Sequence, residues 1–408
     1  MEKAIELGIG FVTGRSHVCK VINNYYKDMI KQVKQLDRRV NITIFLLYDL
    51  SYVGTERSDF YKIIPAVYKD ISVRFITPED IEEEKNRIIS KTDLTEEEAD
   101  MFLGNGHARG RNTLMYWAYM NNMDYLLFWD DDEYPVACIR DKNDEIIWKK
   151  QENLNVHLKN IDNANVTIGY HCGYISPIPY VDFGTEISED EFRTFIEVIS
   201  NDIISWESIK TKIQNDNGIT YADNEIANEK GMYEIQKQGA GKWVAGSTLC
   251  LNLKDISKIP AFYNPKNARG EDTFFSTLLD KSTVLKVPVY HFHDGFLTYS
   301  QIMFENYPNK FEKVINSDLT NGNRFFKACI GWVRYKPLLM YISDKEHYEE
   351  KISVVFEKLK QCIPSMNKLF KNYDFNILLT ELTEYSNRVK EDYEDYLKTN
   401  EIWNKLKS

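Results

Sequence analysis

Four consecutive acidic residues, at positions 130–133, directly follow the apolar run 125–129. Adjacent carboxylates repel one another, so a folded chain that keeps them together needs a cation or many hydrogen-bond donors there. In open α/β sheets, ligands bind beyond the carboxyl ends of the strands. The pattern therefore favours a divalent metal site that involves Asp130, Asp131 and Asp132. A solvated acidic turn is the alternative.

A glycine-rich segment, 104–112, comes shortly before these acids and contains Arg109, Arg111 and Asn112. Glycines allow close backbone approach, a helix start offers free N–H groups, and arginines can grip phosphate with paired donors. Many such turns only cap helices. Together with the acids at 130–133, however, this segment predicts a site for a metal ion and a diphosphate.

A second acidic pair, Glu271 and Asp272, directly precedes an apolar helical run. Attack by an acceptor hydroxyl needs a carboxylate that takes its proton, and Asp272 is the candidate base. The alternative is ordinary helix chemistry, with Asp272 as the N-cap and Glu271 complementing the helix dipole. Both roles are compatible, because a capping bond would fix the carboxylate.

His291 and His293 are two residues apart in an expected strand over 285–292, so both side chains face the same side. One of them can complete a metal site of mixed oxygen and imidazole ligands, which suits manganese. We favour His293, which is nearer the strand end. A hydrogen-bonded structural histidine is the alternative.

Polar residues also follow the first two expected strands. Thr13 and Arg15 follow the first, where Arg15 could approach a phosphate or a base, and Asp49 follows the second, where it could accept from a ring N–H. Turn chemistry is the alternative for all three. Three aromatic residues are candidate contacts for an acceptor sugar, with core packing as the alternative: Trp243, Phe262 and Tyr263.

The alternation of apolar runs with helix-like stretches predicts βαβ units and a mostly parallel sheet in the first third of the chain. The strands are expected at 5–12, 41–48, 71–76 and 124–129, and the helices at about 17–36, 79–90 and 109–122. Further on, a hairpin over 136–140 and 145–149 and a strand over 166–174 predict that the sheet becomes mixed. Residues 186–215 are helical in pattern. The last part, 337–408, is helix-like and charged, with Pro337 and Pro364 as breakers.

Composition bounds the class of protein. The chain has 408 residues, 43% of them apolar, which is enough for a large core, and its net charge of −11 argues against coating of nucleic acid or anionic lipid. Neither a signal peptide nor a membrane span is indicated. Six cysteines without CxxC pairing predict reduced thiols in a cytoplasmic protein, with neither zinc nor disulfides.

The motifs also resemble those of a known family. Ala108-Arg-Gly-Arg-Asn, a helix, and then 125–132 resemble the stretch that ends in the DxD motif of GT-A-fold glycosyltransferases, particularly glycosyltransferase family 2. The segments 243–247 and 267–275 resemble that family's acceptor-side loop and ED motif, and 285–292 its late strand that supplies a histidine. These blocks span about residues 4–300. The resemblance implies an α/β fold of GT-A (Rossmann-like) type, a mixed sheet flanked by helices, with a C-terminal helical extension.

The resemblance further implies a metal-dependent, inverting hexosyltransferase that moves a sugar from a UDP- or GDP-sugar to a hydroxyl of a carbohydrate or other acceptor, with Mn²⁺ or Mg²⁺. Asp272 of the Glu271-Asp272 motif is then the base. Asp132 is the metal ligand, Asp130 lies near the ribose or metal, and Asp131 is an alternative ligand because the register of the triple Asp is ambiguous. Residues 1–335 would form the transferase domain, with a nucleotide-sugar half over about 1–135 and an acceptor half over about 136–335. Residues 336–408 would form the extension and a homo-oligomer contact.

Two other functions stay open. A sugar-nucleotide-forming nucleotidyltransferase shares the architecture and the acidic ligands, but it needs a glycine-rich basic loop after the first strand, and residues 11–16 are a poor version of one. The second is a non-catalytic carbohydrate- or nucleotide-binding protein. Such a protein would not need both acidic motifs.

Overall fold

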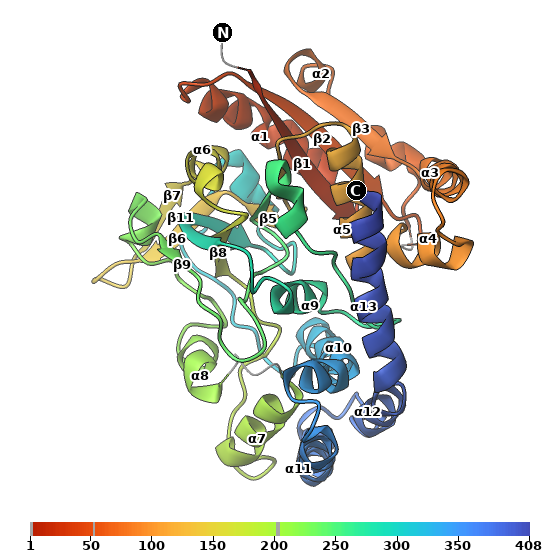
Figure 1. Cartoon of the computed structure of the whole chain (residues 1–408). Helices are drawn as coiled ribbons and strands as arrows, with labels where there is room; N and C mark the ends of the chain where they lie inside the picture. The colour runs from red at the N-terminus through yellow and green to blue at the C-terminus, as the bar shows by residue number, and fades with distance from the viewer. Residues whose placement is uncertain (1–2, 52–53, 201–204) are drawn as a thin grey trace.

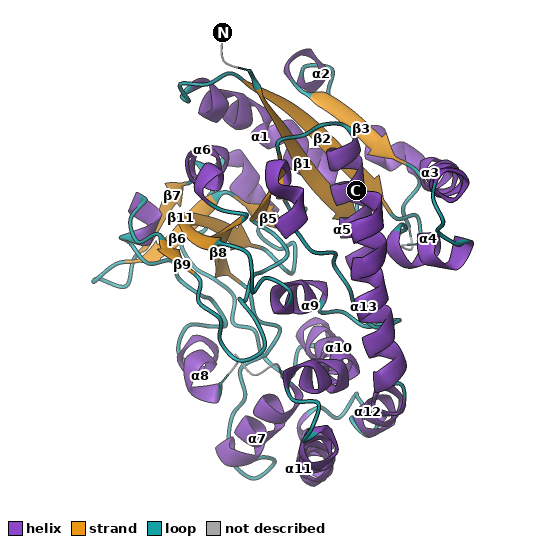
Figure 2. Ribbon diagram, viewed as in Figure 1, coloured by secondary structure: helices purple, strands orange, loops and turns teal. Residues whose placement is uncertain are grey.

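The structure, a computed structural model, describes residues 3–51, 54–200 and 205–408. A curled mixed β-sheet with helices on both faces occupies one end of the molecule, and a helical region occupies the other (Figures 1 and 2). The described strands of the main sheet run in the order β3-β2-β1-β4-β10-β8-β11-β5, and β9 pairs with β11. The predicted mixed α/β class is confirmed.

The first half of the sheet is parallel, as predicted. It contains β1 (Ile5–Thr13), β2 (Val40–Tyr48), β3 (Ser72–Ile76) and β4 (Tyr125–Phe128). The connecting helices are α1 (His17–Lys34), α2 (Val67–Asp70), α3 (Pro78–Lys91), α4 (Glu96–Phe102) and α5 (His107–Met120). The strands are apolar on both sides because helices cover both faces of a parallel sheet. As a result, the carboxyl ends of β1, β2 and β4 meet at one edge.

Helix α5 lies unusually close to the sheet. A Cβ atom at Gly110 would lie 2.7 Å from Val12 Cγ1, and one at Gly10 would lie 2.9 Å from Leu114 Cδ1. Real Cβ atoms do not approach this closely, so Gly110 leaves room for the side chain of Val12 and Gly10 leaves room for that of Leu114. This contact positions Arg111, the residue after Gly110, beside the end of β4.

The second half of the sheet is mixed. Strand β10 (Leu249–Asn252) is antiparallel to β4 and to β8 (Val166–Gly173), β11 (Val284–His293) is parallel to β8, and β5 (Glu133–Tyr134) is antiparallel to β11. The predicted hairpin is present as β6 (Val136–Arg140) and β7 (Ile146–Lys150). The remaining short elements are α6 (Asn153–Asn160), α9 (Glu271–Thr277), β9 (Tyr233–Glu234), η1 (Arg57–Tyr61), η2 (Ile161–Asn163), η3 (Ile226–Asn228), η4 (Leu253–Lys258) and η5 (Ser300–Phe304).

The helical region combines two parts of the chain. Helices α7 (Glu189–Ile199) and α8 (Trp206–Gln214) share an apolar core with α10 (Leu319–Ser343), α11 (Tyr348–Leu369) and α12 (Ile377–Asn387). The last helix, α13 (Val389–Leu406), runs back along the sheet domain (Figure 1). There the ring of Trp403 stacks on that of Phe102 in α4, with ring centroids 5.4 Å apart. The C-terminal helices therefore pack on both halves of the molecule.

One detail of the predicted extension is wrong. Pro337 and Pro364 lie inside α10 and α11 and do not end them. Each proline removes one helix hydrogen bond, and burial of the surrounding residues offsets that loss. The expected boundary at 335/336 lies within the range of α10, and the division into a transferase domain and an extension stays a prediction. None of the described helices combines the length and apolar character that crossing a membrane requires.

Candidate active site

The acids at the end of β4 are divided between several partners. Asp131 is buried and accepts hydrogen bonds from the Thr13 hydroxyl and the Arg15 guanidinium. Arg15 also bonds Asp132, with 2.9 Å between Nη2 and Oδ2. Burial by itself would lower the pKa of Arg15, but the two carboxylates outweigh it and the pKa rises. Thr13 and Arg15 thus hold this end of β4, and the Arg15 amide also donates to Thr13 Oγ1 at 2.9 Å, which is the turn chemistry given as their alternative.

Glu133 anchors a buried network that sequence reasoning missed. Its carboxylate accepts a 2.5 Å hydrogen bond from Ser247 Oγ, and it lies 3.1 Å from His171 Nε2 and 3.2 Å from His291 Nδ1. Burial would raise the pKa of Glu133, but the two histidines hold it well below its ordinary value. His291 is therefore a structural partner that ties β11 to β5. The prediction that His291 and His293 share one side of the strand did not identify Glu133 as a partner of His291.

His293 faces Asp132 from the end of β11. Its Nδ1 lies 2.8 Å from the backbone carbonyl oxygen of Tyr174, so Nδ1 carries the proton and donates it. Its Nε2 faces Asp132, 3.9 Å from Oδ2. An imidazole oriented in this way by a carbonyl is the usual arrangement of a metal-binding histidine. The two donors fit a divalent cation placed between them.

Such a cation would need further ligands. The described part of the chain contains no group of three or more His, Cys, Asp or Glu residues arranged to hold a metal. Mg²⁺ and similar ions often take one or two carboxylates from a protein and complete their shell with water and substrate phosphate. Asp132 and His293 fit that pattern. Asp130, the other predicted ligand, faces Arg111.

Arg111 joins the two acidic motifs. Its Nη2 lies 3.5 Å from Asp130 Oδ1 and its Nε lies 3.3 Å from Glu271 Oε1, while Nη1 donates to the carbonyl oxygen of Gly246 at 2.5 Å. The guanidinium also lies over the ring of Phe128, 5.1 Å from its centroid. A buried arginine with these partners fixes the end of β4 and the start of α9 on opposite sides of one guanidinium. The structure therefore brings Asp130 and Glu271 together.

The predicted catalytic pair lies in the first turn of α9. Gly270, in the left-handed region at φ 95°, is the N-cap, so the interpretation of Asp272 as the cap is wrong. Asp272 Oδ1 instead accepts from the amide of Thr273 at 2.7 Å. Burial and the charge of Glu271 raise the pKa of Asp272 to about 6. Burial also acts to raise the pKa of Glu271, but Arg111 and His107 outweigh it, so the pKa of Glu271 is lowered.

Two predicted diphosphate ligands lie elsewhere. Arg109 is exposed and donates to the carbonyl oxygen of Asp100 at 3.2 Å. Asn112 is fully buried, and its side-chain amide exchanges two hydrogen bonds with the backbone of Phe262. Both are structural in the described molecule. Asp49, at the end of β2, accepts from the amide of Ser51 at 2.9 Å, which is the turn chemistry given as its alternative.

The aromatic candidates are mostly core residues. Phe262 stacks on Phe275 with ring centroids 4.3 Å apart, and Tyr263 packs against Phe274. Both are buried and cannot meet an acceptor sugar. Trp243 is only partly buried, and its indole N–H donates to the carbonyl oxygen of Gln238.

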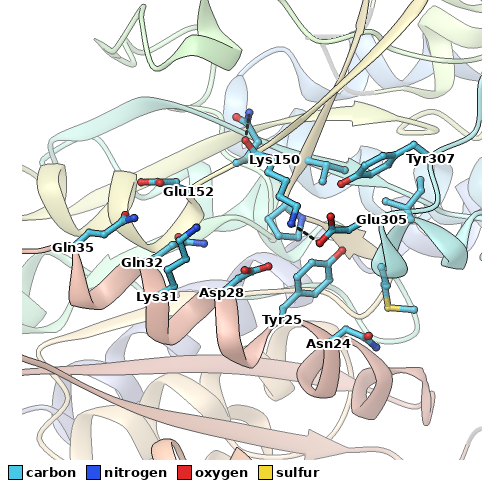
Figure 3. A pocket seen from close by; sticks show the side chains of 15 residues that line it. Asn24, Tyr25, Asp28, Lys31, Gln32, Gln35, Lys150, Glu152, Glu305 and Tyr307 are labelled. Atoms are coloured by element: carbon cyan, nitrogen blue, oxygen red, sulfur yellow. Dashed lines mark hydrogen bonds and ion pairs between the residues drawn. The ribbon is translucent and has the colours of Figure 1, made fainter.

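A separate hollow of about 170 Å³ lies between α1, β7 and η5 (Figure 3). Its lining is of mixed charge and includes Asp28, Lys150 and Glu305, of which Lys150 and Glu305 form an ion pair. Tyr25 also lines it, and its ring lies 5.9 Å from that of Trp129. None of the acids of the two motifs lines this hollow, so it is distinct from the candidate active site.

The chain matches none of the protein-family models and none of the curated proteins with which it was compared. Its function is therefore inferred from the geometry of the site. The described arrangement offers a carboxylate and an imidazole for a cation, arginines among the acids, and a carboxylate with a raised pKa on the far side of Arg111. Together these groups can bind an anionic, metal-associated ligand and remove a proton beside it.

Proposed function

We propose that this chain is a metal-dependent, inverting glycosyltransferase with a GT-A-type fold, related in mechanism to the glycosyltransferases of family 2. It would transfer a sugar from a UDP- or GDP-sugar to a hydroxyl group of an acceptor. The observation that carries the proposal is the bridge by Arg111. Two acidic motifs with different chemistry share one buried guanidinium, although about 140 residues separate them in the sequence.

The first motif would hold the donor. Asp132 and His293 supply the oxygen and nitrogen donors for Mn²⁺ or Mg²⁺, and the bound ion would neutralise charge that develops on the leaving diphosphate. Thr13 and Arg15 keep Asp131 and Asp132 in place. Such preorganised charges stabilise a leaving group best because they need no rearrangement during the reaction.

The second motif would activate the acceptor. Asp272 accepts the proton of the acceptor hydroxyl as its oxygen attacks the anomeric carbon. The pKa of about 6 suits this role, because a base works best when its pKa lies near the operating pH. Glu271 and Arg111 form the ion pair that positions Asp272. One in-line displacement with one base inverts the anomeric configuration.

The test is a transfer assay with UDP- and GDP-sugars, Mn²⁺ and an acceptor panel, with release of UDP or GDP as the readout. Asp272→Asn should lower the rate by at least about 100-fold, the size of effect of a general base, while the affinity for UDP or GDP stays within about twofold. The matched control is Asp280→Asn, an exposed carboxylate eight residues further on that pairs with Lys237. Wild-type turnover by Asp272→Asn would overturn the mechanism.

A further inference from the structure

Arg324 reaches the metal side of the candidate site from the first turns of α10. Its Nη2 lies 3.4 Å from the carbonyl oxygen of Tyr174, the same atom that accepts from His293 Nδ1 at 2.8 Å. Its guanidinium lies over the ring of Phe296, 4.1 Å from the centroid. The cation is therefore next to the imidazole that faces Asp132.

The backbone leaves room for this side chain. A Cβ atom at Gly295 would overlap Arg324 Nη2 and would lie 2.8 Å from His293 Cε1. Any other residue at this position would have to displace the guanidinium or the imidazole. Gly295 thus permits the guanidinium and the imidazole to lie side by side.

Arg324 differs from the other arginines of the site because, although the charges of Asp132 and Asp294 act on it, it forms no close ion pair with either. Arg15 and Arg111 pair with acids, whereas no ion pair of Arg324 is present among the described residues, and its Nη1 is buried without a hydrogen bond. The nearby Asp294 already accepts from the amides of Thr298 and Tyr299. A buried donor without a partner costs about 1–3 kcal/mol, more for a charged group.

The lack of an ion pair at Arg324 does not come from a shortage of acidic residues. The chain has 62 acidic residues for 51 basic ones, so carboxylates are in excess. Burial also lowers the pKa of Arg324 to about 10, which is still far above neutral pH, so the group stays charged. A charged guanidinium that has a free N–H and lies beside a metal-binding pair is suited to an anion that arrives with the metal.

We propose that Arg324 binds the diphosphate of the donor, with Nη1 donating to a phosphate oxygen on the side of Asp132 and His293. Helix α10 is then part of the donor site and not an appended element. This inference rests on the proposed function, because it takes the anion to be the diphosphate of a sugar nucleotide. The bond strengthens as the leaving group gains charge, so Arg324 would bind the product UDP or GDP as well.

The experiment measures the affinity of UDP and GDP, and of uridine and guanosine, in the presence of Mn²⁺ by calorimetry. Whichever of UDP and GDP binds the wild type, Arg324→Ala should lower the affinity for it by about 10- to 100-fold, the loss expected for one charged hydrogen bond. Arg324→Lys should restore part of it. Lys327→Ala is the matched control, because Lys327 is an exposed cation one turn further along α10, and it should bind like the wild type.

The outcomes separate the two proposals. If the wild type binds neither UDP nor GDP, the proposed function fails. If the wild type binds one of them and Arg324→Ala binds it equally well, only the role of Arg324 is overturned. An equal loss for the nucleoside without phosphates would also overturn it. Because Arg324→Ala removes a desolvated charge that forms no close ion pair, its melting temperature without ligand should not fall by much, and a large fall would indicate a structural role instead.

Discussion

Arg111 Nη2 lies 3.5 Å from Asp130 Oδ1, while Nε of the same guanidinium lies 3.3 Å from Glu271 Oε1. These two carboxylates come from the loop after β4 and from the first turn of α9. Their common partner sets the separation between the DxD-like acids and Asp272, the neighbour of Glu271. The geometry of the whole candidate site therefore depends on one side chain of α5.

Removal of Arg111 should destabilise the fold. Arg111→Ala leaves Glu271 and Asp130 without their cation, and loss of one partner of a buried ion pair typically costs about 3–5 kcal/mol. We expect a loss of this size in the free energy of unfolding, measured with urea. Arg109→Ala, two residues away but exposed, should change it by no more than about 0.5 kcal/mol. Equal effects of the two substitutions would contradict the described role of Arg111.

The contrast between Arg109 and Arg111 shows what the sequence could and could not predict. The predicted strands and helices follow from apolar periodicity, and the structure confirms them with small shifts at their ends. Strand β10, which joins the two halves of the sheet, was not predicted, and neither were α4 and α6. Residues two positions apart in a helix are rotated by about 200° about the helix axis, so the side chains of Arg109 and Arg111 point in nearly opposite directions. Which one faces the acids depends on how α5 packs on β1, and that is set by the contact of Gly110 with Val12.

Long-range pairings were equally hidden. Asn112 resembled a phosphate ligand, but its partner is the backbone of Phe262, 150 residues away. Glu133 looked like one more acid of a cluster, and its partners His171 and His291 lie on two later strands. Arg324 lies outside every motif. Local patterns therefore located the acids and the histidine strand, while tertiary contacts decided which side chains are free.

The rate of transfer should depend on pH through Asp272. A base must be unprotonated, and the pKa of Asp272 is raised to about 6 by burial and by Glu271. With Mn²⁺ saturating, kcat/KM should be constant above about pH 7 and should fall about tenfold per unit below about pH 6. The measurement is a pH–rate profile on the active donor. A profile that stays flat to pH 5 would exclude Asp272 as the base.

Charge on Asp272 should cost stability. The folded pKa lies above the ordinary value of about 3.9, so the folded state binds the proton more tightly than the unfolded state. The carboxyl therefore becomes destabilising as the pH rises from about 4 to about 6, and remains so above. The free energy of unfolding of Asp272→Asn should exceed that of the wild type by about 1–3 kcal/mol at pH 7.5. Near pH 4 the two proteins should differ little.

Urea titrations at the two pH values check this expectation. Asp280→Asn, which removes only an exposed ion pair with Lys237, should be nearly neutral at both. A less stable Asp272→Asn at pH 7.5 would mean that the ionised carboxylate stabilises the fold, contrary to the described burial.

His293 should control metal binding. His293→Ala removes the imidazole that faces Asp132. In the presence of UDP or GDP, the affinity for Mn²⁺ should fall by at least about 10-fold. The readout is the thermal stabilisation by nucleotide with and without metal, since a ligand at 100 times its Kd adds about 2.7 kcal/mol. His347→Ala, at an exposed histidine before α11, should respond like the wild type. Full metal-dependent stabilisation of His293→Ala would exclude this ligand.

The most direct test is a crystal structure of the protein with Mn²⁺ and UDP or GDP, using the anomalous signal of manganese. The proposed mechanism predicts a peak bonded to Asp132 Oδ and His293 Nε2, with a diphosphate on the ion and the carboxylate of Asp272 facing the place of the sugar. A manganese peak elsewhere on the chain, or an empty pocket at saturating ligand, would contradict it.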